Sequence, residues 1–161
     1  MNMKKGRWKV YAAWIAFTEA VGAAAGLLTR EDVKLYEATI RKPPLSPPGW
    51  VFPVVWSLLY ALMSTGAARI SLTEPSEKRR RCLRLYLAQL GLNFLWPFLF
   101  FGLQAFSFAF FWLVLLWALL VWMTLSFREL DRPAAYLQIP YLVWVFFAGY
   151  LNFGVWMLNG S

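Results

Sequence analysis

The chain has 161 residues, of which 60% are hydrophobic and 19% aromatic, whereas only 15% carry a charge. A soluble domain carries about 25% charged residues, so this composition excludes an ordinary soluble protein and favours a single membrane domain. The formal net charge is +8. The basic residues lie between apolar runs, which is typical of membrane proteins and argues against nucleic acid as a partner. The chain has no histidine and one cysteine, so we predict no metal site and no bound cofactor.

The first apolar run, residues 9–28, follows a basic N-terminal segment and contains one acid, Glu19. Such a start also fits a signal peptide, but Glu19 interrupts the run and favours a first membrane span. An acid inside a span is a functional candidate, although Glu19 is also close enough to the surface to snorkel. Gly22 and Gly26 share its helical face, and such spacing of small residues more often indicates close helix packing.

A mixed-charge first loop, residues 29–47, leads into the second span, residues 48–69. Thr29 is placed to cap a short helix, with Asp32 three residues further on. The proline lid, residues 43–48, contains four prolines that fix an extended backbone. We expect the next helix to begin around residues 47–49, which places Trp50 at the mouth of that helix beneath the lid.

The remaining apolar sequence predicts three more spans, at 84–102, 107–127 and 134–157. The charge-free stretch 85–127 is about twice the length of one span of ~20 residues, so we predict a break near residues 102–107. The fold class is therefore an all-α membrane protein, a bundle of five transmembrane helices.

The basic residues are unevenly divided between the two ends of this bundle, which predicts a cytoplasmic N-terminus and an external proline lid. The N-terminal side holds Lys4, Lys5, Arg7, Lys9, Arg69, Lys78, Arg79, Arg80, Arg81, Arg84, Arg128 and Arg132. The other side holds Arg30, Lys34, Arg41 and Lys42.

Helical spacing assigns polar and aromatic side chains to shared faces of three spans. These sets are Trp56, Tyr60 and Met63; Gln89, Asn93, Trp96 and Phe100; and Tyr141, Trp144, Ala148 and Asn152. Amides are costly in hydrocarbon, so the amides on these faces should point inward, where the aromatic residues would line an apolar cavity. For any single residue, helix packing or an interfacial belt is the commoner explanation.

Four stretches in order resemble the translocator protein family, also called tryptophan-rich sensory proteins or TspO/MBR. They are PPLSPPGWVFPVVWSLLY (43–60), QLGLNFLWPFLFFG (89–102), PYLVW (140–144) and FAGYLN (147–152). The resemblance runs from the first span to about Trp156. It implies a five-helix bundle in a bacterial cell membrane, commonly a homodimer, with a pocket open toward the first loop.

The resemblance implies binding of porphyrins such as protoporphyrin IX, of sterols and of synthetic benzodiazepine-site ligands. Trp50 and Trp144 match the pocket tryptophans implicated in ligand contact and porphyrin breakdown. Asn93, Trp96 and Ala148 match other pocket positions. With Tyr60 and Glu19 added, the expected ligand-binding set is Trp50, Tyr60, Asn93, Trp96, Trp144, Ala148 and Glu19.

The chain departs from animal members of the family at three points. Leu45 and Phe108 stand where those members carry tryptophan, and no basic residue follows Tyr150, so the C-terminal cholesterol motif is missing. Such motifs are weak in any case. Cholesterol is put in doubt by this loss more than porphyrin is.

Three functions remain open on the sequence. The leading hypothesis is a porphyrin-binding sensor or scavenger in the lipid membrane. The second is an enzyme-like activity, light- and oxygen-dependent porphyrin degradation, in which Trp50 and Trp144 supply oxidisable indoles. The third is a transporter of porphyrin or sterol, although no internal repeat is evident.

Overall fold

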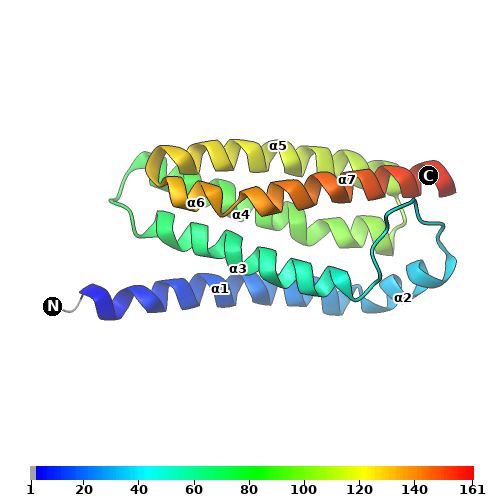
Figure 1. Ribbon diagram of the computed structural model, residues 1–161, viewed down its shortest axis with the longest axis horizontal. Helices are drawn as coiled ribbons and strands as arrows, with labels where there is room; N and C mark the ends of the chain where they lie inside the picture. The colour runs from blue at the N-terminus through cyan, green and yellow to red at the C-terminus, as the bar shows by residue number, and fades with distance from the viewer. Residues whose placement is uncertain (1–2) are drawn as a thin grey trace.

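Five helices in the computed structural model, which describes residues 3–161, are long and apolar enough to cross a membrane. They comprise α1 (Met3–Leu28), α3 (Val51–Ser71), α4 (Glu77–Pro97) with its π-helical continuation η1 (Phe98–Gly102), α5 (Phe106–Leu130), and α6 (Arg132–Tyr136) with α7 (Ile139–Asn159). They lie side by side along one axis, and the chain ends at opposite ends of the bundle (Figure 1). The predicted five-span all-α fold is confirmed, and the protein is an integral multi-pass membrane protein.

Two of the long helices differ from the apolar runs at their N-terminal ends. α4 begins at Glu77, well before residue 84, because Ser76 caps it by accepting a hydrogen bond from the backbone N–H of Arg79 at 3.1 Å. α3 begins only at Val51, so the start expected at residues 47–49 is wrong. The Val51 N–H instead closes a turn on the carbonyl of Pro48 at 3.0 Å, and the helix starts after that turn.

α1 lies at one edge of the bundle against α3, with α5 at the opposite edge (Figure 1). The two backbones approach closely at Gly22, where an added Cβ would collide with the ring of Tyr60. Nothing lies within 4 Å of the corresponding position at Gly26. The small-residue face therefore serves close packing at Gly22 and not at Gly26.

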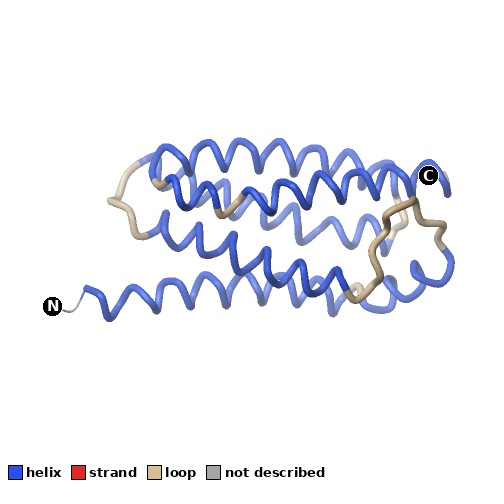
Figure 2. The backbone as a smooth tube through the Cα atoms, in the orientation of Figure 1, coloured by secondary structure: helices blue, strands red, loops and turns tan. Residues whose placement is uncertain are grey.

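The first loop contains the short helix α2 (Arg30–Thr39) and then crosses the end of the bundle to reach α3 (Figure 2). The helix was expected, but its expected cap is not formed. The Thr29 hydroxyl donates to the carbonyl of Ala25 at 2.8 Å instead of accepting from the new helix. The hydroxyl thus joins the first loop to the last turn of α1.

The proline lid is tied to α7 on the far side of the bundle. The Arg41 backbone exchanges two hydrogen bonds with the Asn159 side chain, at 3.0 and 2.8 Å. The Tyr150 hydroxyl donates to the carbonyl of Pro44 at 2.9 Å. Pro43 is buried against Gly154, where a Cβ would collide with the proline ring. These contacts hold the lid across the bundle end.

Prolines and loops interrupt the later spans. η1 follows Pro97 and widens the end of α4, and the chain then turns at residues 103–105, within the stretch where a break was predicted. The fifth span is not continuous, because it divides into α6 and α7 around Leu137 and Gln138. Pro140 sits in the first turn of α7, where its missing N–H costs no helical hydrogen bond.

Candidate functional site

Aromatic rings from α3 and α7 meet inside the half of the bundle nearer the lid. The ring centroid of Trp56 lies 5.5 Å from that of Tyr60, 6.0 Å from Tyr141 and 6.5 Å from Trp144. Phe52, one turn nearer the lid, lies 5.9 Å from Trp144 in an edge-to-face arrangement. Pairs of this kind stabilise by about 0.5–1.5 kcal/mol beyond the area that they bury.

A chain of hydrogen bonds runs beneath these rings and includes two amides of α4. The Tyr60 hydroxyl donates to Asn93 Oδ1 at 3.1 Å, Asn93 Nδ2 donates to the Tyr141 hydroxyl, and that hydroxyl donates to Gln89 Oε1 at 2.9 Å. Gln89 Nε2 then lies 3.7 Å from Met63 Sδ. All are buried, so each polar group is satisfied by another side chain instead of by water.

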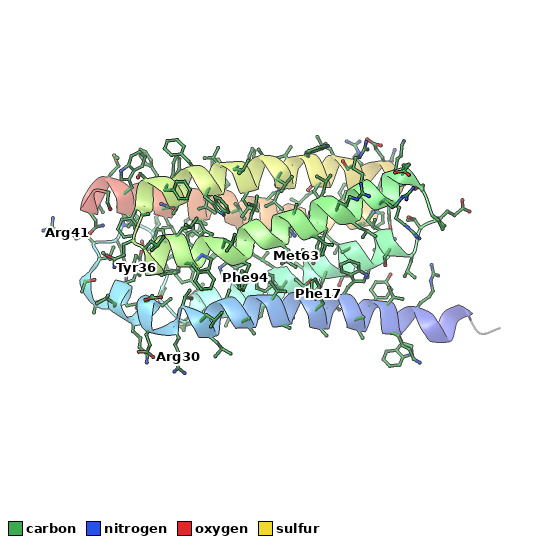
Figure 3. The ribbon with its side chains drawn as sticks, turned by 180° about the vertical axis from the view of Figure 1, so that it is seen from behind. Phe17, Arg30, Tyr36, Arg41, Met63 and Phe94 are labelled. Carbon is green, nitrogen blue, oxygen red and sulfur yellow. The ribbon has the colours of Figure 1, made fainter. Side chains whose placement is uncertain are left out.

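We call this group of rings and amides the aromatic–amide cluster. Its members come from α3, α4 and α7, and they are Phe52, Trp56, Tyr60, Met63, Gln89, Asn93, Tyr141 and Trp144. Met63 lies in the middle of the bundle, whereas Tyr36 and Arg41 lie at the lid end (Figure 3).

A second polar contact lies closer to the lid. Trp96 Nε1 donates to Asn152 Oδ1 at 3.2 Å, and Asn152 Nδ2 donates to the carbonyl of Phe106 at 2.8 Å. The indole of Trp96 stacks on Phe100 with ring centroids 4.8 Å apart. The ring centroid of Phe100 also lies 5.3 Å from that of Tyr36 on α2, so a continuous row of rings joins the interior to the first loop.

Tyr36 of the first loop is half-buried among these rings and lies close to two charged residues. Burial among the rings, with a smaller contribution from the negative charge of Glu37, raises the pKa of Tyr36 to about 12. Lys42 lies 5.5 Å from the centre of the Tyr36 ring and 3.7 Å from the carboxylate of Glu37.

Trp144 is the cluster member with an unsatisfied polar atom. Its ring is half-buried, and its Nε1 is buried without a hydrogen-bond partner. A buried N–H without a partner is uncommon and costs about 1–3 kcal/mol. Ala148 follows one turn later on α7, is 8% exposed and packs in the main hydrophobic core, so little space separates it from its neighbours.

The structure brings together only part of the expected site. Tyr60, Asn93 and Trp144 belong to the cluster, Ala148 lies beside Trp144 on α7, and Trp96 lies one turn beyond Asn93. Trp50 does not join them. It precedes α3, its side chain is 72% exposed, and its ring forms none of the aromatic pairs found in the described chain.

Glu19 is half-buried on α1 and, within the described residues, makes no hydrogen bond to this chain of side chains. On the same helix, Gly22 packs against the Tyr60 ring of the cluster, where an added Cβ would collide. Next to Glu19, the Thr18 hydroxyl of α1 shares a buried hydrogen bond of 2.6 Å with the Tyr86 hydroxyl of α4.

Sequence reasoning missed the central position of Tyr141, which links both amides of α4. The helical spacing had placed Tyr141 on the inward face, but a tyrosine near the end of a span is equally typical of an interfacial belt. Gln89 and Trp56 were also placed on inward faces without being chosen as site residues. Their adjacency to Asn93 and Tyr60 at helical spacing was the available signal.

The protein is thus a small membrane protein, a five-helix bundle with a buried aromatic–amide cluster and a first loop tied across one end. The chain belongs to the TspO/MBR family, which it matches over residues 14–157.

Relatives from different kingdoms support this assignment. The chain is 38% identical to Tryptophan-rich protein TspO of Chlorobaculum tepidum, over 92% of this chain and 94% of the relative. It is 37% identical to the Tryptophan-rich sensory protein of Cereibacter sphaeroides, over 92% of each chain. It is 36% identical to the human Translocator protein, over 80% of this chain and 77% of the relative.

Proposed function

We propose that the protein binds porphyrins, with protoporphyrin IX as the test ligand, at the aromatic–amide cluster, and acts as a tetrapyrrole sensor or scavenger. The observation that carries the proposal is the Trp144 indole, which is half-buried among rings and has a buried N–H without a partner. A ligand acceptor at this N–H would remove the cost of leaving it unsatisfied. The name of the sensory relative supports a sensing role.

Binding of a flat macrocycle at this place requires the ring contacts of Phe52, Trp56 and Trp144 to be exchanged for contacts with the ligand. Each such contact is edge-to-face at present, with interplanar angles of 68° and 89° around Trp144. Offset stacking on a planar ligand has a comparable energy, so the exchange has a low net cost. The Tyr60 and Tyr141 hydroxyls already donate to Asn93 and Gln89, so toward a ligand they could serve only as acceptors.

Titration of the purified protein with protoporphyrin IX tests the proposal, with tryptophan quenching as the readout. Trp144→Phe keeps most of the apolar area but removes the N–H, so we expect affinity to fall by about tenfold, equivalent to ~1.4 kcal/mol. The matched control is Trp122→Phe, because Trp122 is 55% exposed on α5 and lies outside the cluster. Equal losses in the two variants would refute a site at the cluster.

Photooxidative degradation of the bound porphyrin is the second candidate function. It is favoured by the pair Trp56 and Trp144, two indoles 6.5 Å apart that are both oxidisable. Light and dioxygen are the required co-reactants. Faster bleaching of porphyrin with the protein than with the Trp144→Phe variant at equal occupancy supports the activity, and equal bleaching excludes it. Transport is tested separately, by porphyrin flux into vesicles.

We further propose a bacterial cell membrane as the location, a cytoplasmic N-terminus and a homodimeric state. The unequal division of basic residues supports the orientation. The two bacterial relatives noted above support the location. Sterols and benzodiazepine-site compounds remain candidate ligands of the same site, and competition with protoporphyrin IX tests them.

A further inference from the structure

A small polar cavity of about 140 Å³ lies at the basic end of the bundle, at the opposite end from the lid. Three elements that are far apart in sequence form its walls. They contribute Arg7 and Tyr11 from α1, Arg69 from the last turn of α3, Leu72 and Thr73 from the turn after it, and Asp131 before α6. None of these residues belongs to the aromatic–amide cluster, so the cavity is a separate feature of the molecule.

Arg69 is fixed in the cavity wall by Asp131. Its Nε donates to Asp131 Oδ2 at 2.7 Å, and its Nη2 donates to Oδ1 at 3.2 Å. The Asp131 side chain is only 15% exposed, and the Arg69 side chain is 37% exposed. This paired geometry neutralises Asp131 and holds the guanidinium plane, while Nη1 is not used by the carboxylate.

Arg7 adds a second positive charge that Asp131 does not balance, so the cavity has an excess of positive charge. The Tyr11 hydroxyl adds a neutral hydrogen-bonding group to the same wall. The adjoining turn is held by Arg79, whose Nη1 donates to the carbonyls of Ser71 and Thr73 at 3.2 and 2.9 Å. The rim of the cavity is therefore built by defined contacts.

We propose that this cavity binds a phosphate group between Arg7 and Arg69. Guanidinium groups match the geometry of phosphate oxygens, and the cavity volume is well above the ~10–15 Å³ that one water molecule needs by the same measure. The flanking residue Trp8 is 62% exposed at the end of an apolar span, a position typical of the membrane–water boundary. Phospholipid head groups present phosphate at this depth, whereas soluble phosphate esters offer the same chemistry from water.

The test uses the full-length protein in neutral detergent and counts bound lipid by native mass spectrometry. The probes are phosphatidylglycerol, phosphatidylcholine and glycerol 3-phosphate, the last added as a competitor. We expect one phosphatidylglycerol to be retained, and we expect Arg7→Gln to weaken its retention by about tenfold, because a charge-assisted contact to phosphate is lost. The matched control is Lys9→Gln, which removes the same charge from α1 but does not line the cavity.

Loss of retention with Arg7→Gln, and a change of less than about twofold with Lys9→Gln, supports the site. If glycerol 3-phosphate then displaces the lipid at micromolar concentration, the ligand is a soluble phosphate ester; if it does not, the ligand is a lipid head group. Equal losses in both variants mean general attraction to a basic surface and overturn the proposal, as does retention that neither variant changes. Arg7 is exposed, so the variant should fold, and an unchanged melting temperature checks this.

Discussion

Ala148 lies on the same face of α7 as Trp144. It is 8% exposed and packs in the core, one turn along α7 from that indole. Threonine adds a branched polar side chain at a packed position, which costs roughly 1–3 kcal/mol where no space is available. We expect Ala148→Thr to reduce the free energy of protoporphyrin IX binding by more than it reduces the free energy of unfolding. Parallel titration and thermal unfolding measure the two.

The control for Ala148→Thr is Ala118→Thr, because Ala118 is exposed on α5. This variant should leave both affinity and melting temperature nearly unchanged. A lower melting temperature with unchanged affinity in Ala148→Thr would make Ala148 a packing residue and nothing more.

Trp50 provides a second prediction at the scale of a residue. Its exposed indole lies outside the cluster, so it reaches a bound porphyrin only if the first loop rearranges. We expect Trp50→Phe to reduce affinity by less than about tenfold, and by less than Trp144→Phe does. Affinity and light-driven bleaching should be measured on the same preparation. A larger loss of bleaching than of affinity would assign the indole a chemical role.

The inward orientation of individual amides was predictable from the sequence, because an amide in hydrocarbon needs a hydrogen-bond partner inside the protein. Gln89, Asn93 and Asn152 share inward faces by helical spacing, and all three are buried and hydrogen-bonded. Tryptophan and tyrosine are less constrained, since they are stable both in the interior and at the interface. This is why the burial of Tyr141 and the exposure of Trp50 could not be settled by spacing alone.

At the scale of elements, the tie between the first loop and α7 should control access to the site. Asn159→Leu removes both side-chain hydrogen bonds to the Arg41 backbone, each worth about 0.5–1.5 kcal/mol. We expect faster amide hydrogen exchange around residues 40–44 and a faster association of protoporphyrin IX. The control is Met157→Leu, an exposed neighbour on the same turn of α7. Unchanged exchange in Asn159→Leu would show that the proline contacts alone hold the lid.

The helices that cross the bundle were predictable from their apolar runs, whereas their interruptions were not. Hydropathy averages over a whole span and is insensitive to a single wide turn such as η1 or to the break between α6 and α7. Pro97 and Pro140 were the local signals, but a proline within an apolar run is compatible with a kink, a cap or a break. Tertiary contacts decide among these, and a single sequence does not contain them.

For the whole molecule, we predict that the basic end faces the cytoplasm. The measurement replaces the buried Cys82 with serine and introduces one cysteine at either end, by Glu74→Cys or Leu103→Cys. Both positions are exposed, and they lie in loops at opposite ends of the bundle. In intact cells a membrane-impermeant maleimide should label the Leu103→Cys variant and spare the Glu74→Cys variant. The reverse pattern would invert the orientation.

The hydrogen bonds inside the cluster all run in one direction. Tyr60 donates to Asn93, Asn93 to Tyr141, Tyr141 to Gln89, and Gln89 points its N–H at Met63, so the series leaves α3 and returns to it. No member can reverse alone, because its neighbours would then present two donors or two acceptors to each other. A bound ligand that accepts the hydrogen bond of the Tyr60 hydroxyl would leave Asn93 Oδ1 without a donor. An acceptor left buried without a partner costs about 1–3 kcal/mol, so binding of such a ligand would be coupled to the hydrogen bonding of α4.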